Sequence, residues 1–239
     1  MPPKKLNFAT LILFEDDDYV LINKPPFIST LEDRNTQENL LALARASISD
    51  AQVCHRLDKD TSGVLAIAKN PVAYRHLSMQ FENRKVSKIY HAVADGLHQF
   101  QNQCVDAPIL KQNDGTVRIS REGKEAQTWF ASLESFKAHT LIECRPVTGR
   151  MHQIRIHLSL LKAPIVGDET YGGKIFFLSS VKRSFKLEKN TKEQPFIKRM
   201  ALHAFSLEFL NLKGQIINSK APYPKDFQAL LKQLGENKR

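Results

Sequence analysis

The most constraining feature of this sequence is a short apolar run, VLAIAK at residues 64–69, with turn residues on both sides. Ser62-Gly63 precede the run, and Asn70-Pro71 follow it. An apolar run this short predicts a buried strand rather than a helix. Asn70 and Pro71 are typical of the cap and the first residue of a helix, so a strand that leads directly into a helix is expected here.

Further strands and helices are expected along the whole chain. Strands are predicted at residues 11–14, 19–23, 88–95, 127–134, 139–146 and 202–210, and helices at residues 38–46, 148–161 and from Pro224 to Gly235. The order of these elements does not repeat a βαβ unit. The predicted fold class is therefore α+β, with a mixed, mostly antiparallel sheet flanked by helices.

The composition favours a basic protein with a polyanionic partner. The 239 residues are 42% hydrophobic, which suits one elaborate domain or two closely joined subdomains. Lys and Arg total 35 against 25 Asp and Glu, which gives a formal net charge of +10. This excess favours a nucleic acid, because each neutralised phosphate releases counterions; a generally basic, solvated surface is the alternative.

Cysteine usage and hydropathy argue against several classes of protein. Cys54, Cys104 and Cys144 are far apart in the chain, which is unlike a disulfide framework or a zinc site. No stretch approaches the roughly 20 apolar residues of a membrane span, and no signal peptide follows MPPKKLNFAT. A soluble, cytoplasmic protein with no membrane partner is expected.

Residues 174–199 stand apart by their charge. The stretch contains Lys174, Lys182, Arg183, Lys186, Lys189, Lys192, Lys198 and Arg199 against Glu188 and Glu193. We interpret it as a basic insertion or long loop. The sequence leaves two interpretations of this stretch open, namely a solvated loop and an RNA contact.

The segment HRLDKDTSG at residues 55–63 comes just before the predicted buried strand. Loops at the edge of a sheet commonly hold catalytic groups, and Asp58 and Asp60 are the carboxylates available here. Residues Thr61-Ser62-Gly63 are expected to form a tight turn. Residue types alone also allow a purely structural explanation, in which an Asp caps the turn and Arg56 forms a surface ion pair.

The segment TGRMHQIRIHLSLL at residues 148–161 predicts a helix with an apolar face and a polar stripe. A buried Arg155 in this stripe needs an anionic partner, and Asp58 is a candidate. An exposed polar face is the alternative. His152 and His157 are wrongly spaced for one helical face, so no metal site is expected.

Together these segments resemble the RluA-type family of pseudouridine synthases. HRLDKDTSGVLAIAK is similar to the central family motif, KIYHA at residues 88–92 to a K-x-Y-x-A strand, and residues 148–157 to a third motif. EDDDYVLINKPP, GKEAQTWF, PIVGDETYGG and ALHAFSLEF match lesser family landmarks, so the resemblance spans residues 10–212. Phe27, Ile28 and Met151 depart from the usual residues.

The resemblance implies a single catalytic domain over residues 1–239, with two subdomains around a central cleft. It implies Asp58, Tyr90 and Arg155 as catalytic residues, and Arg56, Ile154 and His152 as substrate-binding residues. It further implies a structured ribosomal or transfer RNA as partner, no cofactor and no metal. No additional amino-terminal RNA-binding domain is expected, and a monomer is expected.

The implied reaction isomerises a uridine within RNA. The N1–C1′ bond breaks, the base turns, and C5 joins C1′. Asp58 acts as nucleophile on the sugar or as base in a glycal route, and the sequence leaves both routes open. In this mechanism, Arg155 favours the ionised form of Asp58. Tyr90 stacks on the uracil, and Ile154 forms an apolar floor. Arg56 fills the space left by the flipped base.

Two other functions are compatible with parts of the sequence. A non-catalytic RNA-binding protein on the same fold would tolerate loss of the Asp, Tyr or Arg position, and all three are present. A metal-dependent nuclease could use the EDDD run at residues 15–18. That run falls in a predicted turn, where acidic residues are common for structural reasons.

Overall fold

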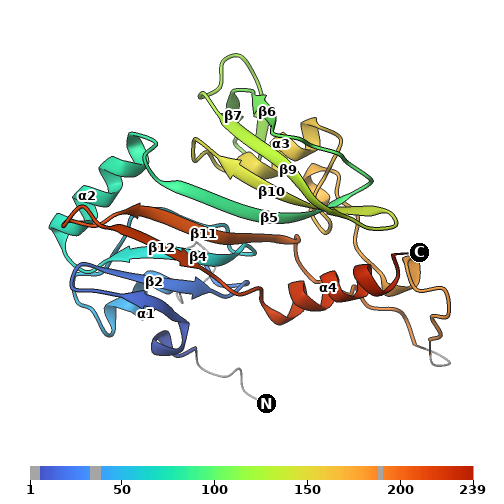
Figure 1. The fold of residues 1–239 in the computed structure, drawn as a ribbon, viewed down its shortest axis with the longest axis horizontal. Helices are drawn as coiled ribbons and strands as arrows, with labels where there is room; N and C mark the ends of the chain where they lie inside the picture. Colours follow the sequence, from blue (N-terminus) through green and yellow to red (C-terminus); the bar gives the residue numbers. More distant parts are fainter. Residues whose placement is uncertain (1–5, 33–38, 188–190, 239) are drawn as a thin grey trace. The chain divides into compact units, whose positions relative to one another are not determined.

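The computed structural model describes residues 6–32, 39–187 and 191–238 and divides into two compact units. Unit one consists of Met1–Lys88 and Ala204–Pro222, and unit two of Ile89–His203 and Tyr223–Arg239. The chain therefore passes from one unit to the other three times. Figure 1 colours the chain by residue number. The expected single domain with a central cleft concerns both units together and stays a prediction.

Unit one is a sheet with short helices. Its elements are η1 (Phe8–Leu11), β1 (Ile12–Glu15), β2 (Tyr19–Lys24), α1 (Leu40–Arg45), β3 (Gln52–Val53), β4 (Ser62–Ala68), α2 (Pro71–Glu82), most of β11 (Leu202–Leu210) and β12 (Ile216–Lys220). The strand order is β1-β2-β4-β11, with β12 paired to β11 and β3 to β4. The β1–β2 turn is capped by Asp16, whose Oδ1 accepts from the backbone N–H of Asp18 at 2.9 Å and of Tyr19 at 2.7 Å.

The core of unit one forms around β4, all of whose residues are buried. Tyr19 and Leu21 of β2 pack with alternate residues of β4 and with Ala73 and Leu77 of α2. The side chain of Asn70 accepts from the N–H of Ala73 at 2.8 Å and caps α2, as the sequence predicts. The strand therefore leads directly into a capped helix.

Unit two contains its own run of antiparallel strands and a separate two-stranded hairpin. It contains β5 (Ser87–Asp95), β6 (Gln103–Asp106), the hairpin β7 (Ile109–Lys111) and β8 (Val117–Ile119), β9 (Gln127–Ser135), β10 (His139–Pro146), α3 (Gln153–Leu160), η2 (Glu169–Tyr171), η3 (Leu178–Ser180) and α4 (Lys225–Glu236). The strand order is β5-β10-β9-β6. Figure 1 shows β9, β10 and β5 side by side, and α3 contacts β9 and β10.

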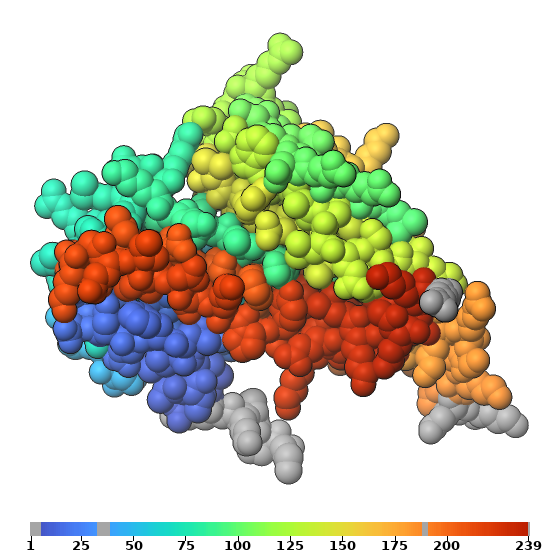
Figure 2. Space-filling model, viewed as in Figure 1, coloured from blue at the N-terminus to red at the C-terminus, as the bar shows by residue number. Residues whose placement is uncertain are grey.

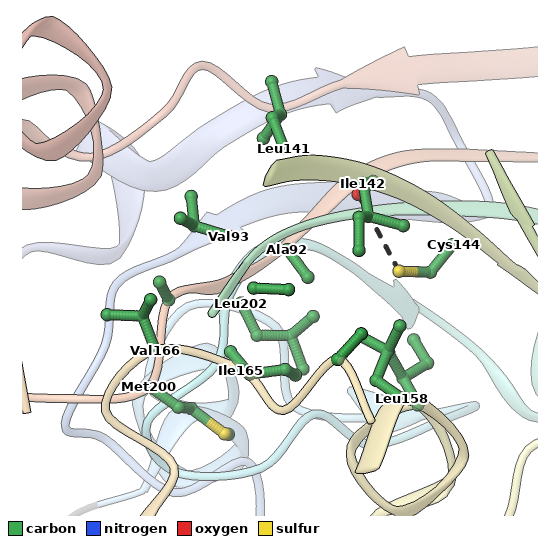
Figure 3. Close-up of a cluster of buried hydrophobic side chains, with 14 of the residues drawn as sticks. Ala92, Val93, Leu141, Ile142, Cys144, Leu158, Ile165, Val166, Met200 and Leu202 are labelled. Carbon is green, nitrogen blue, oxygen red and sulfur yellow. Dashed lines mark hydrogen bonds between the residues drawn. The ribbon is translucent and has the colours of Figure 1, made fainter. Parts of the chain in front are cut away.

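A large apolar cluster fills the space beside these strands. Figure 3 shows Ala92 of β5 and Ile142 of β10 close to Leu158 of α3 and to Ile165. The buried face of α4 adds Phe227, Leu230 and Leu234 to the same cluster. Unit two therefore has its own core.

The predicted α+β class with a mostly antiparallel sheet is confirmed. Two helix boundaries were predicted wrongly. The helix expected from residue 148 begins at Gln153, because His152 has a left-handed φ of 54°. The closing helix does not stop at Gly235 but runs through it to Glu236. Residue 38, the expected start of an earlier helix, lies outside the described residues.

None of the helices in the described part of the chain has the length and apolar character needed to cross a membrane.

Gly63 is required by close packing inside unit one. Its φ is +119°, and a Cβ built on it would lie 2.1 Å from the carbonyl oxygen of Ala204. We therefore expect Gly63→Ala to lower the free energy of unfolding by at least about 2 kcal/mol, measured by urea denaturation.

Gly115→Ala is the matched control, because Gly115 has a φ of +84° but nothing within 4 Å of its Cβ position. It carries backbone strain without the clash, so we expect it to cost about 1 kcal/mol. Equal costs at the two positions would contradict the role assigned to the contact with Ala204.

Candidate active site

Asp58 lies in the loop that joins β3 to β4, and its side chain is half-buried. The N–H of Thr61 donates to the carbonyl oxygen of Asp58 at 3.0 Å, which closes a turn over residues 58–61. The expected turn over Thr61-Ser62-Gly63 was thus placed too late, since Ser62 and Gly63 already belong to β4. Arg56 precedes the turn and is exposed.

The ammonium group of Lys24 anchors this loop from β2. Lys24 is fully buried, and its Nζ donates to the carbonyl oxygens of Pro25 at 3.0 Å, Lys59 at 3.0 Å and Thr61 at 2.7 Å. Lys24 faces Gly63 in the β2–β4 pairing, so the sheet register brings its side chain to the loop. Hydrogen bonds to a charged donor are stronger than neutral ones, so the backbone around Asp58 is held firmly.

Two further contacts fix the same loop. The hydroxyl of Thr30 donates to the carbonyl oxygen of Leu57 at 2.9 Å and accepts from its N–H at 3.3 Å. The N–H of Phe27 donates to the carbonyl oxygen of Lys59 at 2.9 Å. The residues on both sides of Asp58 are therefore tied to the segment that follows β2.

His55 connects the start of the loop to β4 as a neutral imidazole. Its Nε2 accepts from the N–H of Ala66 at 3.1 Å, and its ring stacks on Phe81 with centroids 4.7 Å apart. Burial, and secondarily the charge of Lys88, lower the pKa of His55 to about 3. Burial also lowers the pKa of Lys88 to about 8. His55 therefore serves as a hydrogen-bond acceptor at neutral pH.

Tyr90 lies on β5 in unit two and faces Cys144 in the pairing with β10. Its side chain is half-buried and packs against the apolar cluster of unit two. The next residue, His91, points its Nδ1 to the hydroxyl of Tyr223 at 2.5 Å. Burial, and then the nearby His203, lower the pKa of His91 to about 4.

Arg155 lies on α3 and forms a bidentate ion pair with Asp168. Its Nε and Nη2 donate to the two carboxylate oxygens of Asp168 at 2.6 and 2.7 Å. The exposed fraction of the Arg155 side chain is 11% and that of Asp168 is 1%. The guanidinium also lies 4.8 Å from the ring centroid of Tyr171. The orientation of Arg155 is thus fixed within unit two.

Gln153 organises the start of α3. Its Oε1 accepts from the hydroxyl of Thr148 at 2.7 Å and the N–H of Arg150 at 2.9 Å. Its Nε2 donates to the carbonyl oxygen of Gln127 and the hydroxyl of Thr128, both at 2.9 Å. The amide thereby ties the loop before α3 to β9. Ile154 follows it and is buried.

The two histidines of this segment have separate environments. His152 points its Nδ1 to the hydroxyl of Tyr171 at 2.8 Å, and its ring meets that of Tyr171 edge-on. His157 is fully buried between the hydroxyl of Thr128 and the carbonyl oxygen of Ala107, each 3.0 Å away, and burial lowers its pKa. Among the described residues, no group of His, Cys, Asp or Glu side chains is placed to hold a metal ion.

The predicted site residues thus divide between the units. Asp58 and Arg56 belong to unit one, whereas Tyr90, Arg155, Ile154 and His152 belong to unit two. The expected Asp58–Arg155 pair joins the two units and stays a prediction.

Sequence reasoning missed three residues that hold the candidate site: Lys24, Gln153 and Asp168. Each lies within a segment that resembles the family, namely NKPP, TGRMHQIR and PIVGD. Their position in these segments was the one signal in the sequence that could have identified them as site residues. Their hydrogen-bond partners depend on tertiary contacts, which the motifs do not state.

Comparisons with known proteins show which class of protein this fold and this loop belong to. A family model described as RNA pseudouridylate synthase matches residues 18–160. Ribosomal large subunit pseudouridine synthase D of Xanthomonas campestris is 36% identical over 236 residues, which cover 95% of this chain and 70% of that protein. Ribosomal large subunit pseudouridine synthase C of Haemophilus influenzae is 35% identical over 235 residues, covering 95% and 69%.

A solved structure agrees with these relatives. Human RNA pseudouridylate synthase domain containing 4 has a TM-score of 0.76 and 28% identity, and the match covers 95% of this chain and 94% of that one. The chain belongs to the RNA pseudouridylate synthase family, and the resemblance to its RluA-type members is confirmed. It is accordingly an isomerase that forms pseudouridine in RNA.

Removing the Lys24 ammonium should loosen the Asp58 loop. Lys24→Met leaves the buried carbonyl oxygens of Lys59 and Thr61 without this donor, so we expect a loss of about 2–3 kcal/mol in the free energy of unfolding. Amide hydrogen exchange at Thr61 should accelerate as well. Lys59→Met is the control, since Lys59 is exposed and we expect it to change stability by less than about 0.5 kcal/mol. Unchanged exchange at Thr61 in Lys24→Met would refute the anchoring role.

Removing Arg155 should strand the buried carboxylate of Asp168. We expect Arg155→Met to cost about 3–5 kcal/mol in urea unfolding. The double variant Arg155→Met/Asp168→Leu should regain at least half of this loss, because neither charge is then buried alone. A single variant within about 1 kcal/mol of the parent protein would contradict a buried, mutually dependent pair.

Proposed function

We propose that this chain converts specific uridines to pseudouridine in large-subunit ribosomal RNA, with Asp58 as the catalytic carboxylate. The RNA is inferred from the relatives in Xanthomonas campestris and Haemophilus influenzae, which are named as ribosomal large subunit pseudouridine synthases. The observation that carries the role of Asp58 is its loop. Lys24, Thr30 and Phe27 hold the backbone on both sides of it, while its own side chain stays partly accessible.

The reaction needs an ionised carboxylate beside the ribose. The N1–C1′ bond breaks, C5 forms the new bond to C1′, the C5 proton leaves, and N1 regains a proton. Asp58 takes part either by attacking C1′ or by removing a sugar proton. Both routes return the carboxylate unchanged, so no oxidant, group donor or cofactor has to enter the balance.

The remaining site residues act on the base and on the charge of Asp58. Tyr90 stacks on the uracil and assists removal of the C5 proton, and the buried Ile154 forms an apolar floor. Arg155 keeps Asp58 ionised and oriented, and its own orientation is supported by the ion pair with Asp168. His152 contributes to substrate binding at the start of α3.

Arg56 fills the space that the uridine leaves when it turns out of its stack. Its exposure and its position two residues before Asp58 support this role. Leaving the stack costs roughly a few kcal/mol in a duplex and less in a loop, so a uridine in a loop of the ribosomal RNA is the favoured target. We further propose that the chain acts as a monomer in the cytoplasm.

Asp58→Asn tests the assignment. It keeps the size of the side chain but removes the charge, so we expect pseudouridine formation to fall by at least about a thousandfold. The measurement is tritium release from large-subunit ribosomal RNA labelled at uridine C5, because the C5 proton is lost when the new bond forms. RNA affinity and unfolding should change little.

Asp60→Asn is the matched control, because it removes a carboxylate from the same turn two residues away. We expect it to retain most of the activity. Turnover that survives in Asp58→Asn, or that falls equally in both variants, would overturn the role of Asp58. If the parent protein releases tritium from transfer RNA but not from ribosomal RNA, the substrate is wrong and the catalytic residue is untouched.

A further inference from the structure

Exposed cations gather on the segment Lys174–Lys198, which the reaction itself does not use. Lys174, Lys182, Arg183, Lys186, Lys192 and Lys198 are all exposed. In the described part of the segment, which omits residues 188–190, the carboxylate is that of Glu193, and its Oε1 accepts from the N–H of Ser179 at 2.9 Å. Figure 2 shows the orange atoms of this segment at the molecular surface. The described surface is therefore strongly positive.

The segment is folded onto the core of unit two although it has little regular structure. Phe176, Val181 and Ile197 are buried in the apolar cluster of that unit. The N–H of Phe196 donates to the carbonyl oxygen of Phe176 at 2.9 Å, and the two rings meet edge-on at 5.9 Å. The contacts between Phe176 and Phe196 hold the two ends of the loop together, and the exposed cations lie along the chain between and beside them.

The start of the loop is joined to the residue that orients Arg155. The N–H of Gly167 donates to the carbonyl oxygen of Lys174 at 2.8 Å, and the N–H of Lys174 donates to Asp95 Oδ2 at 2.8 Å. Asp168, next to Gly167, holds Arg155. The cationic loop and the candidate catalytic helix α3 are thus linked by one short, hydrogen-bonded segment of unit two.

Arg199 does not belong to this surface, although the sequence grouped it with the other cations. Its side chain is fully buried, and its Nε donates to Asp226 Oδ2 at 2.7 Å. It also donates to the carbonyl oxygens of Met200 at 3.2 Å and Leu202 at 3.1 Å. Arg199 therefore fastens the end of the loop to the start of α4.

We propose that the exposed cations of residues 174–187 and 191–198 form a phosphate-binding surface that grips the RNA backbone. The inference rests on the proposed function for the identity of the polyanion. Phosphate contacts position a nucleic acid without reading its sequence, which suits cations spread along an irregular loop. Anchoring at both ends lowers the entropy lost when the loop binds.

The test is RNA binding by Lys182→Gln/Arg183→Gln/Lys186→Gln, with an unmodified hairpin transcript carrying a uridine in its loop as the probe. We expect the slope of log Kd against log salt to fall by about 2, since each lost phosphate contact removes about 0.7 for single-stranded RNA. The same arithmetic gives a roughly ten- to hundredfold weaker Kd at 0.1 M salt. In turnover, KM should rise more than kcat falls.

Lys137→Gln/Lys213→Gln/Lys220→Gln is the matched control, because it removes the same charge from exposed positions elsewhere. We expect its salt slope to stay within about 0.5 of the parent value. Equal losses in the two triple variants would overturn the proposal in favour of diffuse attraction. Unchanged RNA binding with weaker binding to anionic phospholipid vesicles would overturn it in favour of a membrane surface. The binding measurement does not depend on catalysis. It therefore tests this proposal even if the assignment of Asp58 as the catalytic residue is wrong.

Discussion

One buried ammonium group holds the backbone on which the catalytic assignment depends. Burying a cation is costly unless hydrogen bonds replace its water, and Lys24 Nζ finds carbonyl oxygens of Pro25, Lys59 and Thr61 within 3.0 Å. These carbonyls belong to segments that lack strand partners of their own. The lysine and the loop therefore satisfy each other, and the antiparallel register of β2 and β4 sets where they meet.

Much of the fold could be predicted because local patterns and tertiary packing agree. The boundaries of β10 and β11 match the predicted ranges, and Asn70 caps α2 as expected. The errors fall where backbone geometry overrides residue preference. His152 adopts a left-handed conformation and delays α3, whereas Gly235, a typical helix terminator, lies within α4, which the buried Leu230 and Leu234 attach to the core.

The candidate site was predictable as a set of motifs but not as a set of contacts. The motifs named Asp58, Tyr90 and Arg155, because particular residue types recur in a particular order. They could not show that Arg155 has Asp168 as a bidentate partner, since the two meet only after the chain turns back on itself. For the same reason Arg199 was grouped with the surface cations, although Asp226 pairs with it in the interior.

The threefold passage of the chain between the units has a consequence for synthesis on the ribosome. Unit one needs Ala204–Pro222 to add β12 and most of β11, and unit two needs Tyr223–Arg239 to add α4. Neither unit is contiguous, so unit one cannot complete its core before Ala204–Pro222 has emerged, and unit two cannot do so before Tyr223–Arg239 has emerged. Before the first of these segments emerges, β4 lacks its neighbour β11, and such open strand edges are prone to aggregation. Truncation before α4 would leave unit two with an exposed apolar face.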